Sequence, residues 1–168
     1  AAKGETWGLS VEGHHLSLNF SLTGNKIVDS TPQFMGSNPA EWRSSFGAKF
    51  PKGLRVLGDE EQLGFELVTS LDEKPLSAAM LAGEVPEEIR GAGQAQPVVE
   101  PAAGISASQL NSDQQALLKK LIETYSSKMR PGVAKQRWDS IDESGFDNVK
   151  FAWSGAVKPG VGHYYRVQ

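Results

Sequence analysis

The order of hydrophobic patterns along the chain predicts an α+β fold, in which an antiparallel sheet from the N- and C-terminal strands packs against two helical hairpins. Strand-like alternation marks the two ends of the chain, whereas helical spacing marks the middle, from about 59 to 145. Strands at both ends with helices between them are typical of α+β domains. A length of 168 residues favours a single domain, 1–168, with a flexible connection near 91–104.

The first strands are expected in residues 6–28. Four alternate residues of this segment are large, apolar and on one face: Leu16, Leu18, Phe20 and Leu22. Gly24 and Asn25 follow as a turn signal, and apolar residues resume at Ile27. This pattern predicts a hairpin of two antiparallel strands.

Residues 31–51 combine several prolines and glycines with large aromatic residues, which predicts a long ordered loop. Asp59 then opens a helix with Gln62 three residues later, as in a capping arrangement. Pro75 suits the first turn of a second, short helix. These two helices form the first predicted helical hairpin.

The second predicted pair of helices follows the connection near 91–104. Ser112 and Gln115 have capping-box spacing at the start of a helix with one apolar stripe. A further helix ends at Gly145. Two strands then complete the chain, at 148–154 and 163–168, and the glycine-rich segment between them predicts a hairpin.

Composition excludes several classes of site. The chain has no cysteine, so disulfides, thiolate zinc sites and cysteine nucleophiles are excluded. A pI near 5.6 without a basic block predicts no nucleic-acid partner, and the lack of an apolar run of about 20 residues predicts no membrane partner. Localisation stays open, with a secreted or periplasmic location favoured over a cytoplasmic one.

The three histidines all fall on predicted strands and are the candidate metal ligands. Strand alternation places His14 on the face of Leu16 and His15 on the opposite face, so at most one of them is expected to bind a given metal. If the terminal strands pair, His15 and His163 approach each other, and a carboxylate would complete a site for a divalent metal. The alternative for His14 is a core histidine with one satisfied nitrogen.

The last strand carries the candidate catalytic residues His163, Tyr165 and Arg166. The imidazole and the phenol offer acid–base chemistry, and the guanidinium can bind an anion. Alternation places His163 and Tyr165 on one face and Arg166 on the other. The alternative is an edge strand whose amphipathic side chains cover the sheet.

Several motifs resemble a bacterial family called domain of unknown function 3500. They are GHHLSLN at 13–19, PQFMGSNPA at 32–40, GLRVL at 53–57, and FAWSG at 151–155 with HYYRVQ at 163–168. The resemblance implies a helical region before the first motif and, after the last, an acidic strand and a His-x-His segment. It therefore implies that this chain is the core of something longer. If the distal histidines join His15 and His163, the resemblance implies a metal-binding pocket of which this chain holds half.

Two functions follow as hypotheses. The first is a metal-assisted enzyme, hydrolase-like or oxidative, in which His15 and His163 bind the metal or transfer protons and Arg166 holds an anionic group. The second is a non-catalytic structural or binding module whose exposed strand edges pair with another chain, either as a homo-oligomer or with a different protein.

Overall fold

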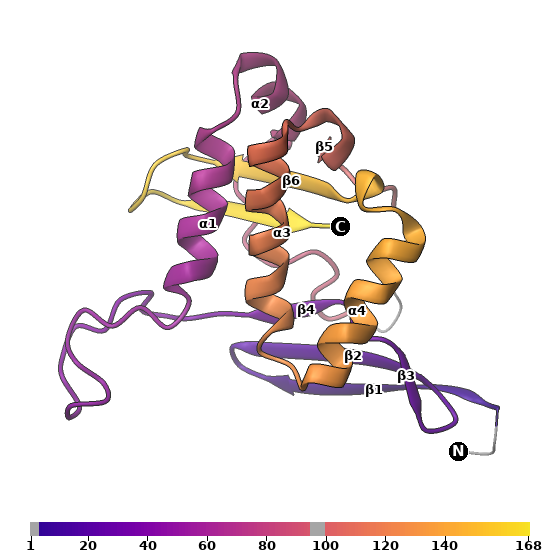
Figure 1. Cartoon of the computed structure of the whole chain (residues 1–168). Helices are drawn as coiled ribbons and strands as arrows, with labels where there is room; N and C mark the ends of the chain where they lie inside the picture. The colour runs from indigo at the N-terminus through magenta and orange to yellow at the C-terminus, as the bar shows by residue number, and fades with distance from the viewer. Residues whose placement is uncertain (1–3, 95–99) are drawn as a thin grey trace. The chain divides into compact units, whose positions relative to one another are not determined.

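The computed structural model describes residues 4–94 and 100–168, and it confirms the α+β class. The chain forms two compact units, one of residues 1–61 and 124–143 and the other of residues 62–123 and 144–168. Each unit contains one antiparallel sheet (Figure 1). The connection predicted near 91–104 falls partly on residues 95–99, which lie outside the described residues.

The sheet of the first unit is four-stranded and is built around its second strand. Its strands are β1 (Thr6–Gly13), β2 (Leu16–Thr23), β3 (Lys26–Asp29) and β4 (Gln33–Met35). β1 lies along one edge of β2, while β3 and β4 share the other edge. The predicted hairpin at Gly24 is confirmed, and its positive φ of 59° is a conformation that glycine adopts at little cost. The predicted loop at 31–51 is irregular except for β4.

Helix α4 (Pro131–Ser144) is joined to this sheet by polar side chains. Gln136 donates through Nε2 to the carbonyl oxygen of Val28 at 2.7 Å. Arg137 donates through Nε to Ser30 Oγ at 3.0 Å and through its terminal nitrogens to the Ser30 carbonyl and to Gln33. The helix ends before Gly145, as the sequence predicts, because φ is 83° at that glycine.

The second unit is built around the other sheet, whose strand order is β5 (Ile105–Ser106), β6 (Lys150–Gly155) and β7 (His163–Val167). The helices α1 (Gly58–Thr69), α2 (Glu73–Ala79) and α3 (Ser112–Ser126) confirm the other predicted helices. Short 3-10 turns occupy Ala107–Gln109 and Phe146–Asn148. The largest fully buried side chains of this unit come from β5, β6 and the helices: Trp153, Phe151, Leu67, Ile105, Leu118 and Leu121.

The prediction of one sheet from both ends of the chain is wrong, because the N-terminal and C-terminal strands form separate sheets. The physical reason lies in the central strands. β2 is paired along one edge by β1 and along the other by β3 and β4, and β6 is paired by β5 and β7. Both central strands therefore have neighbours on both edges, and neither offers an edge to the other; the carbonyl oxygen of Trp153 on β6 also accepts a bond from Leu81.

The predicted cap of α3 is displaced by one residue. Asn111 and Gln114 exchange side-chain and backbone hydrogen bonds, each of 3.0 Å, in the reciprocal manner expected of Ser112 and Gln115. Gln115 instead donates to the carbonyl oxygen of Ala107 at 2.9 Å. No helix in the described parts of the chain is both long and apolar enough to cross a membrane.

Candidate functional site

His163 is packed into a layer of aromatic rings in the second unit. Its imidazole stacks on the indole of Trp153 in the neighbouring strand β6, with 5.3 Å between ring centroids and 6° between ring planes. Phe65 of α1 lies 4.7 Å from His163 and 5.0 Å from Trp153, again between centroids. Trp153 is fully buried and His163 is half-buried. Packing therefore holds the imidazole in one orientation.

A backbone hydrogen bond assigns the tautomer of His163. Nδ1 lies 2.9 Å from the carbonyl oxygen of Val161. Because a carbonyl oxygen only accepts, Nδ1 carries the proton, and a neutral ring then has its lone pair on Nε2. Histidines that bind metals or remove protons are commonly oriented by such a bond. His163 thus has the proton arrangement that its predicted roles require.

The structure separates the three predicted catalytic residues into two groups. Tyr165 extends the aromatic layer, stacked on Trp153 with centroids 6.1 Å apart, and its ring also lies beside Gly64 of α1. Arg166 is adjacent to Tyr165 on β7 and so lies on the opposite face. Its Nε is buried and has no hydrogen-bond partner among the described residues. His163 and Tyr165 therefore come together, whereas Arg166 faces away from both.

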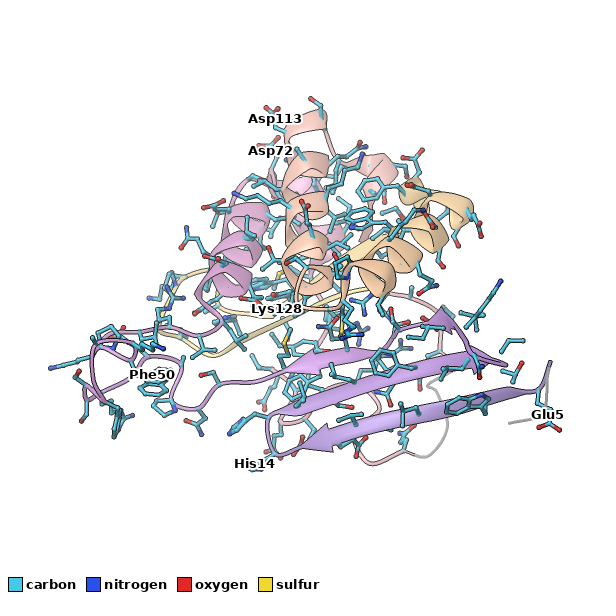
Figure 2. All side chains as sticks on the ribbon, turned by 60° about the horizontal axis from the view of Figure 1, so that its bottom comes forward. Glu5, His14, Phe50, Asp72, Asp113 and Lys128 are labelled. Carbon is cyan, nitrogen blue, oxygen red and sulfur yellow. The ribbon has the colours of Figure 1, made fainter. Side chains whose placement is uncertain are left out.

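His14 and His15 occupy the turn between β1 and β2, not the start of a strand. The expected strand alternation does not apply at a turn, so the prediction that they face opposite ways is wrong. Their rings meet edge to face with 4.4 Å between centroids, and both side chains are exposed. Figure 2 shows His14 at this end of the hairpin, opposite to Glu5. His15 also accepts a backbone hydrogen bond from Gly36 at 2.9 Å.

The predicted metal pair of His15 and His163 depended on pairing of the terminal strands, which the structure does not show. His15 lies in the turn between β1 and β2 of one sheet, His163 lies on β7 of the other, and the terminal strands do not pair. Within residues 4–94 and 100–168, no group of three or more histidine, aspartate or glutamate residues is placed to hold a metal. A metal site that uses both histidines therefore stays a prediction.

The open edge of β1 is the most exposed regular backbone of the first unit. All eight residues of β1 are exposed, and within the described residues β1 pairs only with β2. The register runs from Thr6 opposite Thr23 to Gly13 opposite Leu16 without a shift. β1 therefore presents a regular, unpaired row of backbone donors and acceptors.

One hydrogen bond shows which backbone groups face this edge. Gly24 donates to the carbonyl oxygen of Glu5 at 3.0 Å, which marks these two residues as a hydrogen-bonded pair. Such pairs alternate along an antiparallel ladder, so the odd-numbered residues of β1 bond to β2. The even-numbered residues direct their N–H and C=O groups outward: Thr6, Gly8, Ser10 and Glu12.

A row of apolar side chains runs beside the open edge. Trp7, Leu9 and Val11 are 37%, 46% and 45% exposed and share one face of β1. Each lies opposite an apolar residue of β2, since Trp7 faces Leu22 and Leu9 faces Phe20. The apolar face of the sheet thus extends to β1, where it is exposed to solvent. An exposed apolar patch of this kind commonly marks an interaction site.

The strand-like pattern of residues 6–22 predicts one continuous strand, so it does not reveal the edge of β1. A signal was present in the phase of the alternation. Apolar residues occupy odd positions up to Val11 and even positions from Leu16 onward. A single strand cannot change phase without turning its apolar residues to the other face, so the change indicates a reversal of the chain between these residues.

Arg137 is a strongly buried charge of the first unit, as is Glu60, and its surroundings are those of a structural residue. The side chain is 8% exposed, and it donates hydrogen bonds to Ser30 and Gln33. Burial lowers the pKa of the guanidinium below its usual value, while the negative charge of Asp29 acts in the opposite direction. The bonds join α4 to Ser30, between β3 and β4, and to Gln33 at the start of β4.

Comparison with known proteins identifies a family and no individual relative. No curated protein and no solved structure matches the chain. The sequence model of the family described as protein of unknown function DUF3500 matches residues 1–168. This match spans both units, the histidine turn, the β1 edge and the aromatic layer of β7. The chain therefore belongs to the DUF3500 family.

Proposed function

We propose that this chain is a non-catalytic binding module that pairs with another polypeptide strand through the open edge of β1. The observation that carries the proposal is the condition of that edge, which is eight residues long, regular and exposed. Edge strands of natural proteins are commonly protected by lysine, proline, a bulge or a very short length. β1 contains neither lysine nor proline, and its register is unbroken.

The opposite edge of the same sheet differs in each of these respects. β3 has four residues, it begins at Lys26 and ends at Asp29, and its register with β2 shifts between Ser21 and Leu22. β4 has three residues and follows Pro32. The sheet thus protects one edge and leaves the other open, which favours β1 as the edge that receives a strand. Backbone bonds would supply affinity, and Trp7, Leu9 and Val11 would supply apolar contacts.

A proline substitution tests this proposal. The N–H of Ser10 faces outward, so Ser10→Pro removes a donor from the edge without removing a bond to β2. Ser10→Ala is the matched control, because it loses the same side-chain bonds to Glu12 and Asn19 but keeps the N–H. The probe is a lysine-flanked peptide of eight alternating valines and threonines, added to dilute protein. Amide hydrogen exchange is followed by NMR.

We expect the peptide to slow exchange at Gly8 and Ser10 in the unsubstituted protein, and at Gly8 in Ser10→Ala, because these amides acquire acceptors. Ser10→Pro should bind at least tenfold more weakly than Ser10→Ala, which corresponds to about 1.4 kcal/mol. Unchanged exchange at Gly8 at every peptide concentration would contradict the proposal. Equal binding by the two variants would also contradict it.

The second candidate function is a metal-assisted enzyme, hydrolase-like or oxidative, centred on β7. The observation that favours it is the Val161 bond, since it leaves the lone pair of a neutral His163 on Nε2, the form that binds a metal or removes a proton. Calorimetric titration with Zn²⁺ tests it, using His163→Ala and His15→Ala with His14→Ala as control. Loss of zinc binding in His163→Ala and His15→Ala, with binding kept in His14→Ala, would support the site. No zinc binding by the unsubstituted protein would count against it.

A further inference from the structure

We infer that the strand received by β1 is β1 of a second copy of this chain, so that two four-stranded sheets join across a two-fold axis at Leu9. The inference rests on the proposed role of the β1 edge and adds the identity and the register of the partner. The observations that carry it are the sequence of β1, the direction of its backbone groups and the protection of the other sheet edge.

The sequence of β1 is complementary to itself when two copies run antiparallel with Leu9 opposite Leu9. Trp7 of one copy then lies opposite Val11 of the other, and Gly8 lies opposite Ser10. Thr6 lies opposite Glu12, so the only charged residue of the strand faces a neutral one. Apolar side chains thus meet apolar side chains on one face, and like charges are not placed opposite each other.

The backbone supports the same register. The groups that face outward belong to the even-numbered residues, as the bond between Gly24 and Glu5 indicates. With the axis at Leu9, the outward groups of Gly8 meet those of Ser10, and the outward groups of Thr6 meet those of Glu12. Every outward donor of the strand then finds an acceptor in the other copy.

Neighbouring registers are less favourable. An axis at Ser10 would place Trp7 opposite Gly13, and an axis at Gly8 would place Val11 opposite Glu5. In either case an apolar side chain loses its apolar partner. The axis at Leu9 is therefore the register in which Trp7, Leu9 and Val11 all have one.

The assembly is expected to stop at two copies. A two-fold pairing uses the same edge of both copies and is closed. Growth would require the other edge of the sheet, which carries Lys26 and Asp29 and an irregular register. The expected species is a dimer with one continuous antiparallel sheet.

Two measurements test the inference. The first is the mass from light scattering over a dilution series, for the unsubstituted protein, Ser10→Pro and Ser10→Ala. We expect a dimer that dissociates on dilution, at least tenfold weaker association in Ser10→Pro than in Ser10→Ala, and little change in Ser10→Ala. A dimer that Ser10→Pro leaves intact would overturn the inference, because another surface would then hold the two copies together.

The second measurement uses the absence of cysteine from the chain. At the axis the two Leu9 residues form a pair without direct backbone bonds, about 4.5 Å apart between Cα atoms, which suits a disulfide. Leu9→Cys should therefore give a cross-linked dimer under mild oxidation. Val11→Cys is the control, because its two thiols would be separated by four residues of strand, about 13 Å, which a disulfide cannot span. Equal cross-linking of both variants would overturn the register.

Failure of this inference can be distinguished from failure of the proposed function. A monomer at all concentrations whose Gly8 and Ser10 amides are protected by the strand peptide would overturn the second copy as partner and leave the binding edge supported. A monomer whose amides are not protected would overturn both.

Discussion

Replacing Arg137 by methionine tests how α4 is held to the sheet of the first unit. Arg137 is 8% exposed and donates to three acceptors, the hydroxyl and carbonyl oxygens of Ser30 and the side-chain oxygen of Gln33. Ser30 is itself buried. Methionine fills a similar volume but has no donor, so Arg137→Met leaves the acceptors of Ser30 in an apolar setting.

The expected loss can be worked from these bonds. A buried acceptor without a donor costs about 1–3 kcal/mol, and Ser30 would have two. Against this, removal of the buried cation relieves a desolvation penalty of several kcal/mol. With Gln33 as the third acceptor the loss is about 6 kcal/mol at the middle of this range, and relief of the desolvation penalty returns about 3 kcal/mol, so we expect Arg137→Met to lower the free energy of unfolding by about 2–4 kcal/mol. Arg137→Lys should lose at least as much, because a compact ammonium is more strongly hydrated and lacks the planar fork.

Urea unfolding measures the effect, and Lys135→Met on the same helix is the control. Lys135 is 74% exposed and pairs with Asp139 at 2.6 Å, so its loss should cost about 0–0.5 kcal/mol. An Arg137→Met variant that loses less than about 1 kcal/mol would refute the reasoning, because the bonds to Ser30 would then contribute little beyond the cost of burial.

Two further predictions concern helices. Asn111→Ala should lower the free energy of unfolding by about 1 kcal/mol in chemical denaturation, whereas Ser112→Ala should change it by less than about 0.5 kcal/mol, because Asn111 is the residue that caps α3. A larger loss in Ser112→Ala than in Asn111→Ala would show that Ser112 is the cap, as the sequence predicts. Gly64→Ala should lower the melting temperature, because its Cβ would come within 3.0 Å of the Tyr165 ring, which is stacked on its neighbours. Gly132→Ala meets nothing within 4 Å and should raise stability by up to about 1 kcal/mol, so a similar gain in both variants would show that the ring moves freely.

The candidate site could be predicted only in part from the sequence. Alternation correctly placed His163 and Tyr165 on one face of the last strand and Arg166 on the other. It could not show that Phe65 packs against His163, because Phe65 comes from a helix that is distant along the chain. Period-two patterns report the face on which a residue lies, but not what covers that face.

The turn at His14 and His15 could not be predicted for a different reason. Gly13, His14, His15 and Leu16 lack the Asn-Gly or Asp-Gly pair that commonly marks a two-residue hairpin turn. The Gly24 turn has a glycine at the position with positive φ and was predicted. The change of phase between Val11 and Leu16 was therefore the sole local indication that β1 is a separate strand with an open edge.

The sequence by itself determined the helices, the hairpin at Gly24, the hairpin of the last two strands and the α+β class, because these depend on side-chain periodicity, caps and turn residues within a few positions of each other. Only the tertiary structure decided that the strands form two sheets and that β1 is an edge. Strand pairing depends on which backbone edges are already occupied by segments elsewhere in the chain, and periodicity carries no information about that. The assignment of His163 to a different sheet from the hairpin that carries His15, and the exposure of Trp7, Leu9 and Val11, follow from this pairing.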